Sequence, residues 1–367
     1  MRINLLDPGL VAVAGHHLEY DLRIALELAS RGHDARVYAH VKVGAEVRAL
    51  FPANVEVTPI FRVHPYWDWS LIDPVCGELT AFLDGALMLA ADLRGVREAE
   101  VWMWPTVLAP QLFACTVARP KAALSGCVHV EPTFGAPNGR MWWRYAFLKA
   151  REAGLRPNLG VNVPALASEY SPLAGEGEVK CFPIAHDGAP PGACRTALRK
   201  IGFFGHQRRE KGTGLLPALL PRLLQDGYEV VVQDSGDQVG AMAAPGLTKL
   251  DYVPSVAEEI AKCDLVVAPY DPVAYRVRGS GIVWDSIASG VPVILPARTE
   301  MGTLVESTGA GKLVESLEAQ DVYRSILEAR RDYATLARAA FEASQAWRGT
   351  HGIRRFVSAM LGEAQAA

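Results

Sequence analysis

Three cations are gathered in one short segment in the second half of the sequence. Residues 205–212 read GHQRREKG and follow an apolar run at 200–205 (KIGFFG) that predicts a buried strand. A helix is expected directly after them, and the backbone amides at a helix start attract anions, while Lys and Arg supply the counter-charge that a diphosphate needs. The segment predicts a diphosphate site, with a solvated basic loop as the alternative. The candidate residues are Gly205, His206, Arg208, Arg209 and Lys211.

A second segment with the character of a phosphate loop lies at residues 279–293 (GSGIVWDSIASGVPV). Ser280 and Gly281 open an expected helix at 281–289, and the amides there can hold a phosphate without any side chain. A dinucleotide cofactor is not expected. No G-x-G-x-x-G follows the first strand, and the near matches at 212–214 and 279–281 lack the third glycine.

Histidines are the other side chains that could do chemistry. His129 ends an apolar run at 122–129, where a histidine can exchange protons near neutral pH or belong to a hydrogen-bonded core. His16 and His17 are adjacent and so point apart, and no third ligand cluster accompanies them. The sequence contains no Asp-x-Asp and no C-x-x-C. Neither a metal nor another cofactor is therefore expected.

The composition excludes several classes of protein. Half of the 367 residues are hydrophobic and 21% are charged, which is typical of a globular protein. The 37 Lys and Arg against 40 Asp and Glu lack the basic excess that nucleic-acid binding demands. The sequence contains no run of about 18 uncharged apolar residues, so no membrane-spanning segment is expected. The first residues do not resemble a signal peptide. We expect a cytoplasmic protein that binds no nucleic acid.

Short apolar runs alternate with longer amphipathic segments over nearly the whole chain, which predicts repeated βα units around parallel sheets. An α/β fold of two Rossmann-like, doubly wound domains follows, with a site in the cleft between them. Residues 185–197 contain two consecutive prolines and predict the linker. The expected strands lie at 2–7, 35–40, 99–104, 122–129 and 158–163, and then at 200–205, 228–233, 264–269, 291–296 and 311–314.

The two glycine-containing segments resemble motifs of glycosyltransferase family 4, whose members have the GT-B fold. Gly205, Lys211 and Gly212 match the G-R-x-x-x-x-K-G motif in which Arg and Lys hold the donor diphosphate, with His206 in place of the Arg. Residues 288–293 match the A-x-G-x-P-V ending of the family's glycine loop and helix at every fixed position. Asp285 then falls on the family's second Glu, which implies that its carboxylate binds the nucleotide ribose.

The resemblance is weaker over the rest of the chain. Gly15, His16 and His17 stand where the family has its glycine-rich loop under the donor phosphates, and His129 resembles the active-site histidine beside the donor sugar. Residues 345–348 (QAWR) open a last helix similar to the one that crosses back to the first domain. The resemblance implies an N-terminal domain that binds the acceptor (1–190) and a C-terminal domain that binds the nucleotide-sugar donor (191–345). It also implies a C-terminal helix (346–367) that packs back on the N-terminal domain.

One position departs from the family pattern. The family's first Glu, which contacts donor-sugar hydroxyls, falls on Val277. Arg276, Arg278 or another side chain could replace it. If no side chain replaces this Glu, the alternative is a chain that binds a nucleotide sugar without transferring it.

Residues 139–156 (GRMWWRYAFLKAREAGLR) predict a helix with two distinct faces. Arg140, Arg144 and Arg151 lie on one face with Trp143 and Phe147 beside them. Such a face suits an anionic lipid surface, a lipid-linked acceptor or sugar stacking on Trp143, and a solvated face is the alternative. The stripe expected to be core consists of Met141, Tyr145 and Leu148.

These residues predict a glycosyltransferase that moves a sugar from a nucleotide-diphosphate donor to an acceptor, a glycan or lipid-linked glycan. The family resemblance implies retention of the anomeric configuration, and no cofactor is expected besides the donor. Peripheral contact with the inner face of a membrane is a further expectation. Two alternatives remain open: a non-hydrolysing sugar-nucleotide epimerase that uses Glu131, His129 and His186, and a nucleotide-sugar-binding protein without transfer activity, which Val277 favours.

Overall fold

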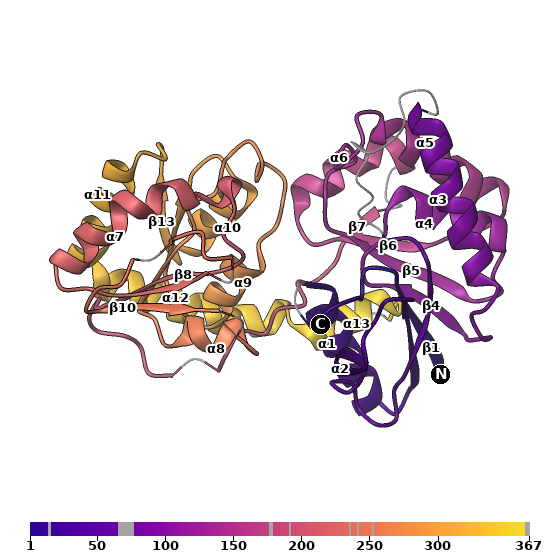
Figure 1. Ribbon diagram of the computed structural model, residues 1–367, viewed down its shortest axis with the longest axis horizontal. Helices are drawn as coiled ribbons and strands as arrows, with labels where there is room; N and C mark the ends of the chain where they lie inside the picture. Colours follow the sequence, from indigo (N-terminus) through magenta and orange to yellow (C-terminus); the bar gives the residue numbers. More distant parts are fainter. Residues whose placement is uncertain are drawn as a thin grey trace. The chain divides into compact units, whose positions relative to one another are not determined.

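A computed structural model describes residues 1–13, 16–64, 77–175, 179–190, 192–234, 236–240, 242–251 and 253–363. The chain divides into two compact units (Figure 1). Unit 1 consists of Met1–Ala185 and Ile353–Ala367, and unit 2 consists of His186–Gly352. The chain therefore passes between the units twice, at 185–186 and at 352–353.

Unit 1 is built on a parallel sheet of seven strands in the order β3-β2-β1-β4-β5-β6-β7. The chain order reverses between β1 and β4, so this is the point in the sheet where ligands of doubly wound folds usually bind. The strands are β1 (Arg2–Asp7), β2 (Asp34–His40), β3 (Glu56–Phe61), β4 (Val101–Trp104), β5 (Ala123–Val128), β6 (Asn158–Val161) and β7 (Val179–Cys181).

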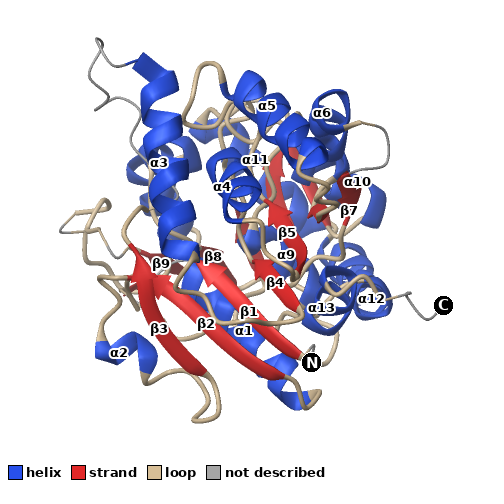
Figure 2. Ribbon diagram, turned by 90° about the vertical axis from the view of Figure 1, so that its right-hand side faces the viewer, coloured by secondary structure: helices blue, strands red, loops and turns tan. Residues whose placement is uncertain are grey.

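Helices cover this sheet in two groups. In one group α1 packs with the C-terminal helix α13, because Leu18, Ile24 and Phe356 belong to a single buried cluster with the strands. The other group places α3, α4, α5 and α6 in succession, and Figure 2 shows α3, α4 and α5 side by side. The helices are α1 (His16–Ser30), α2 (Ala45–Arg48), α3 (Gly77–Leu93), α4 (Ala109–Ala118), α5 (Gly139–Glu152), α6 (Pro164–Ala174) and α13 (Ile353–Met360).

Helix α5 faces the core with the opposite side from the one predicted. Met141 is 51% exposed and Leu148 is 42% exposed, whereas Trp143 and Phe147 are buried. The prediction that Met141 and Leu148 form core was therefore wrong. The buried face consists of the rings that cover most apolar area, and Trp142 stacks on Phe82 of α3 with ring centres 4.8 Å apart. Arg140 and Arg144 remain exposed.

Unit 2 contains a parallel sheet of six strands in the order β10-β9-β8-β11-β12-β13. Its core joins Phe203 of β8, Leu219 of α7 and Val267 of β11. The strands are β8 (Lys200–Phe203), β9 (Glu229–Gln233), β10 (Leu247–Leu250), β11 (Leu265–Val267), β12 (Val293–Pro296) and β13 (Gly311–Val314). The helices are α7 (Leu216–Gln225), α8 (Val256–Ala261), α9 (Gly281–Ala288), α10 (Glu300–Thr308), α11 (Ala319–Arg331) and α12 (Tyr333–Thr350).

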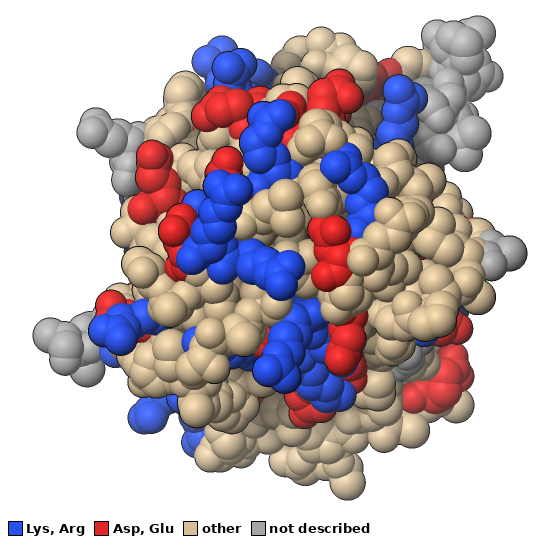
Figure 3. Space-filling view, turned by 90° about the vertical axis from the view of Figure 1, so that its left-hand side faces the viewer, with Lys and Arg blue, Asp and Glu red and all other residues tan. Residues whose placement is uncertain are grey.

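The two parallel sheets confirm the predicted α/β class with two Rossmann-like domains. On the face shown in Figure 3, Lys and Arg side chains lie among Asp and Glu, and no broad region of that face has a single sign. Within the described ranges, no helix combines the length and apolar character needed to cross a bilayer.

Candidate functional site

The loop after β8 is fixed by hydrogen bonds to the end of β9. The Gly205 N–H donates to Gln233 Oε1 at 2.8 Å, and Gln207 Nε2 donates to the Gln233 carbonyl at 2.9 Å. Gly205 has φ of 91°, a conformation that glycine adopts easily. The loop therefore leaves the carboxyl end of the sheet in a defined conformation and leads into the 3₁₀ turn Arg209–Lys211.

Lys211 turns its ammonium group back over this loop. A Cβ placed on Gly205 would lie 2.8 Å from Lys211 Nζ, and Nζ lies 5.8 Å from the centre of the Tyr270 ring. Burial, together with the nearby charge of Arg208, lowers the pKa of Lys211 to about 8, although Glu210 acts in the opposite direction. No carboxylate forms an ion pair with Lys211 in the described part of the chain. Lys211 is thus a partly buried cation with no ion-pair partner among the described residues.

Gly212 is required by the way this turn packs. Its φ is 77°, and a Cβ there would lie 2.3 Å from the Pro269 carbonyl oxygen. The backbone after Lys211 therefore lies against the segment that follows β11. This contact explains why a glycine follows the lysine, since any side chain would push the turn away.

The other predicted cations of the loop lie at the surface. Arg208 is 60% exposed at its side chain and approaches Glu210 at 3.7 Å, and Arg209 and His206 are exposed. Of the predicted diphosphate ligands in this loop, only Lys211 has its charged group packed against the protein, beside Gly205 and Tyr270. Roles for His206, Arg208 and Arg209 remain predictions.

The start of α9 is linked to Lys211 through Tyr270. Ser280 caps the helix by accepting a hydrogen bond from the Val283 N–H at 3.4 Å, and its hydroxyl lies 3.0 Å from the Tyr270 hydroxyl. The ring of the same tyrosine faces Lys211. The first amides of the helix, those of Gly281 and Ile282, are at its open end. A cation and a helix N-terminus therefore meet around one tyrosine, an arrangement that suits a phosphate group.

Asp285, the predicted ribose ligand, is paired with a residue that the spacing did not predict. Its Oδ1 accepts a hydrogen bond from His186 Nδ1 at 3.0 Å, and the two residues are only 2% and 4% exposed. The His186 carbonyl in turn accepts from Trp347 Nε1 at 2.7 Å. Oδ2 makes no hydrogen bond to any described residue. One oxygen of Asp285 is therefore bound within unit 2, and a ribose role for this residue remains a prediction.

Val277 is buried, and the rings of Tyr270 and Tyr275, which precede it in the sequence, are stacked with centres 4.3 Å apart. No carboxylate stands at position 277, and Arg276 is exposed whereas Arg278 is partly buried. A carboxylate contact to donor-sugar hydroxyls is therefore not available from this position.

In unit 1, His17 is held by a buried carboxylate at the end of β1. Asp7 Oδ2 accepts from His17 Nδ1 at 2.7 Å, and Asp7 Oδ1 accepts from the Gly9 N–H at 2.7 Å. Burial alone would raise the pKa of Asp7, but His17 and these hydrogen bonds hold it below its ordinary value. Burial and the charge of Asp7 raise the pKa of Asp21 well above its ordinary value.

The Asp7–His17 contact was not predicted, although a signal for it exists. Asp7 is the last residue of β1 and His17 is the second of α1, so both lie at the carboxyl edge where the strand order reverses. His16 is exposed, and its ring centre lies 4.2 Å from that of His17, so the prediction that the two adjacent histidines point apart was wrong. Gly15 lies outside the described residues, so the predicted donor loop is described only from His16 onward.

His129 follows β5 at the same edge of the sheet. Its Nε2 donates to the Pro105 carbonyl at 2.8 Å, and its ring packs edge-on against Tyr20 at 5.1 Å. This hydrogen bond fixes the ring and assigns the proton of the neutral imidazole to Nε2. Because β5 neighbours β4, His129 lies close to the point of chain reversal.

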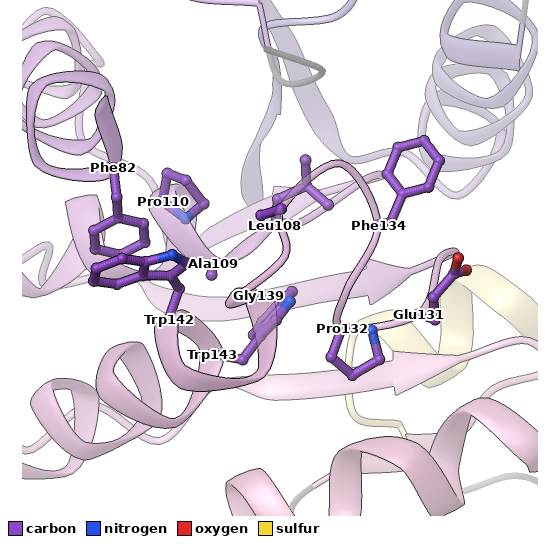
Figure 4. Close-up of a pocket in the computed structure, with 11 residues that line it drawn as sticks. Phe82, Leu108, Ala109, Pro110, Glu131, Pro132, Phe134, Gly139, Trp142 and Trp143 are labelled. Carbon is purple, nitrogen blue, oxygen red and sulfur yellow. The ribbon is translucent and has the colours of Figure 1, made fainter. Parts of the chain in front are cut away.

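Unit 1 also contains a pocket (Figure 4). Its cavity volume is small, about 40 Å³. Segments that follow the neighbouring strands β4 and β5 form its walls together with α3 and the start of α5. Glu131 is the only charged residue among the described residues that line it, and Trp143 of the predicted acceptor side also lines it.

The described residues contain no group of three or more His, Cys, Asp or Glu side chains placed to hold a metal ion. The cysteines Cys115, Cys127 and Cys263 are buried, and burial raises the pKa of each thiol.

Solved structures of low sequence identity share this architecture. WaaG, a glycosyltransferase involved in lipopolysaccharide biosynthesis, is 14% identical with a TM-score of 0.67, over 99% of this chain and 100% of that one. Sucrose-phosphate synthase from Thermosynechococcus elongatus is 12% identical with a TM-score of 0.70, over 98% and 97%. HepE from Anabaena, solved with UDP and glucose, is 17% identical with a TM-score of 0.66, over 99% and 100%.

This chain has the GT-B fold. The predicted GT-B architecture, with Rossmann-like parallel sheets in both units, is thereby confirmed. No family model and no curated protein matches the sequence. Likeness at this level of identity shows the fold alone, so the activity must be argued from the residues of the site.

Proposed function

We propose that this protein is a glycosyltransferase that moves a sugar from a nucleotide-diphosphate donor to an acceptor hydroxyl. In the reaction the bond between the sugar C1 and the diphosphate oxygen breaks, and a bond from C1 to the acceptor oxygen forms. The nucleoside diphosphate leaves with the electron pair, and the acceptor proton passes to the leaving diphosphate or to solvent. The protein's part is to stabilise the negative charge that develops on the diphosphate.

The observation that carries this proposal is the uncompensated charge of Lys211 beside the start of α9. A protein gains nothing in stability from a partly buried ammonium without a counter-ion, since burial penalises its charged form. We expect the charge to serve ligand binding. A diphosphate supplies the missing anion and accepts hydrogen bonds from the amides of Gly281 and Ile282. The Ser280 hydroxyl is already used by the helix cap and by Tyr270.

The remaining roles follow from position. We assign the ribose hydroxyls to Asp285 Oδ2, the reacting sugar to the neighbourhood of His129, and the acceptor to unit 1. Transfer would proceed with retention and without a metal, as the family resemblance implies. A glycan or a lipid-linked glycan is the acceptor class that the resemblance favours. His16 and His17 are assigned to the donor phosphates only on the strength of that resemblance.

A panel of nucleotide sugars tests the proposal against its two rivals. We expect free nucleoside diphosphate to accumulate with one donor, and only when an acceptor is present. An isomerised donor without release of nucleotide would indicate an epimerase. Calorimetric binding of nucleotide sugar without turnover, over a broad acceptor panel, would indicate a binding protein and agree with the missing carboxylate at Val277.

Peripheral membrane contact makes a separate prediction for α5. Met141 and Leu148 are exposed, and Arg144 is exposed on the same helix, so this side offers apolar and cationic groups to an anionic bilayer. The protein is expected to co-sediment with anionic liposomes at low salt and to be released as salt rises. Arg140→Glu with Arg144→Glu should abolish co-sedimentation and leave nucleotide binding intact. Equal sedimentation of wild type and variant would contradict this contact.

A further inference from the structure

Exposed apolar side chains are gathered on three neighbouring helices of unit 1. Eleven large apolar side chains are exposed in the described part of the chain, and six of them belong to α3, α4 and α5, which Figure 2 shows side by side. These six define the α3–α5 face: Leu79, Leu87 and Met88 of α3, Val117 of α4, and Met141 and Leu148 of α5. Single exposed apolar side chains are ordinary, whereas a group of this size marks a site of contact.

The α3–α5 face has the size of a protein interface. Its outer helices, α3 with 17 residues and α5 with 14, are about 25 and 21 Å long, and three neighbouring helices span about 30 Å. This area approaches the roughly 800 Å² that each partner contributes to a standard interface. A second protein surface could therefore cover the whole face.

The charges of the three helices are separated by sign. Helix α3 carries three acidic residues and no basic one, α4 carries no charged residue, and α5 carries four basic residues and one acidic residue. Several of these charges are used in ion pairs within the chain, namely Asp92–Arg62 at 2.7 Å, Arg140–Glu169 at 2.6 Å and Lys149–Glu152 at 2.6 Å. Asp84 of α3 and Arg144 of α5 are exposed, and their side chains make no ion pair or hydrogen bond with a described residue.

Aromatic contacts set the level of the three helices. Phe113 of α4 lies 5.6 Å from Phe82 of α3 and 5.4 Å from Tyr145 of α5, measured between ring centres. The strands of this sheet are parallel, so each helix returns the chain in the same direction. Asp84 comes two residues after Phe82. Arg144 comes one residue before Tyr145, so the two charges stand at nearly the same level, on opposite sides of α4.

We propose that the α3–α5 face binds the same face of a second copy of this chain, around a two-fold axis that runs along α4. Such a contact is isologous, so α3 of each copy lies on α5 of the other and the acidic edge meets the basic edge twice. Asp84 of each copy then faces Arg144 of the other. The apolar side chains between these two ion pairs are removed from water.

An anionic bilayer is the competing occupant of this face. It presents one sign of charge everywhere, so it would attract α5 and repel Asp84 of α3. A second copy complements both edges. The second copy and the membrane contact predicted above for α5 use the same side chains of Met141, Arg144 and Leu148, so one excludes the other.

Sedimentation equilibrium of the full chain measures the association. We expect wild type to be a dimer, and Leu87→Ser to weaken the dimer by about tenfold or more because each copy loses apolar contact. Leu26→Ser is the matched control, since Leu26 of α1 is 49% exposed and Leu87 is 51% exposed. This control should dimerise as wild type. Wild type that stays monomeric up to about 100 μM would overturn the proposal.

Charge reversal tests the two-fold geometry. Asp84→Arg and Arg144→Asp each place like charges together at two points, so each variant alone should dimerise about tenfold more weakly or worse. Mixed in equal amounts, they should form a heterodimer about as tight as the wild-type dimer, because both contacts then join opposite signs. The double variant Asp84→Arg with Arg144→Asp should also recover. Single variants that dimerise as wild type, or a mixture and a double variant that both stay apart, would overturn this pairing.

The same variants distinguish a bilayer from a second copy. If a bilayer covers the face, wild type is monomeric in solution, Asp84→Arg sediments more strongly with phosphatidylglycerol vesicles and Arg144→Asp less strongly. That pattern would refute the dimer. The inference goes beyond the proposed transferase, and none of these measurements involves donor or turnover. Uridine diphosphate binding, measured separately on wild type, therefore tests the transferase whichever oligomeric state is found.

Discussion

Replacing Lys211 by Met is expected to make the free protein more stable and to lower its affinity for nucleoside diphosphates by about tenfold or more. The two effects have one cause. Burial disfavours the charged lysine in the free protein, and its pKa of about 8 records that penalty. Met keeps most of the packing of the side chain and removes the charge. The gain in the free energy of unfolding should be about 1–3 kcal/mol at pH 7.

The depressed pKa of Lys211 also determines whether stability rises or falls with pH. The lysine titrates at about 8 in the folded chain and at its ordinary value of 10.5 when unfolded. The unfolded chain therefore holds the extra proton between these values, and wild-type stability should rise with pH across this window. Lys211→Met lacks this rise, so the difference in stability is largest below pH 8 and vanishes above pH 10.5. Thermal melts from pH 7 to pH 10 measure it.

Donor binding should show the opposite trend. A diphosphate favours the charged lysine, so the affinity of wild type for a nucleotide sugar is expected to fall as pH rises above 8, by up to about tenfold per pH unit. Lys211→Arg is the matched control, because Arg stays charged throughout this range. A variant Lys211→Met that binds diphosphates normally, or that melts below wild type at pH 7, would show that Lys211 serves the fold and not a ligand.

The central strands of both sheets could be predicted because they are apolar on both sides. β1, β8 and β12 were expected at nearly their observed positions, since a short continuous apolar run bounded by turn residues has few other structures open to it. β10 (LTKL) and β7 (VKC) were not predicted. They lie at sheet edges with several exposed residues, so their sequences carry neither a continuous apolar run nor a clean alternation.

Helix α5 shows what periodicity alone cannot decide. Its sequence carries two apolar stripes, one through Met141 and Leu148 and one through Trp143 and Phe147, and either could face a sheet. The structure buries the second because Trp143 meets Tyr170 of α6 edge-on at 5.0 Å, a contact that depends on the neighbouring helix. A hydrophobic pattern identifies the helix, whereas the partner that it packs against decides which face is buried.

The residues of the candidate site also fall into two groups, those that local sequence predicts and those that depend on the tertiary structure. Lys211 and Ser280 could be predicted from local spacing, because loops after strands and starts of helices are local features. The partners of Asp285 and His17 could not, since His186 is 99 positions from Asp285 and the Asp7 contact depends on how α1 lies on β1. Buried hydrogen bonds of this kind are fixed by the tertiary structure, and a single sequence does not record them.

Removing either partner of the His186–Asp285 pair is expected to cost about 2–4 kcal/mol of stability, the largest loss that we predict for a single site. Both side chains are almost fully buried, so His186→Leu leaves a carboxylate without its donor and Asp285→Leu leaves an imidazole without its acceptor. Chemical denaturation of each single variant measures the loss. A drop below about 1 kcal/mol in both would contradict the pairing.

The double variant separates this structural role from ligand binding. His186→Leu with Asp285→Leu removes both members of the pair, so part of the lost stability should return. If Asp285 Oδ2 binds the ribose, the folded double variant should still lose the preference for a ribonucleotide over its 2′-deoxy analogue, which we expect to be about tenfold in wild type. A double variant that regains stability and keeps this preference would limit Asp285 to its contact with His186, and the ribose would then be bound by other residues of unit 2.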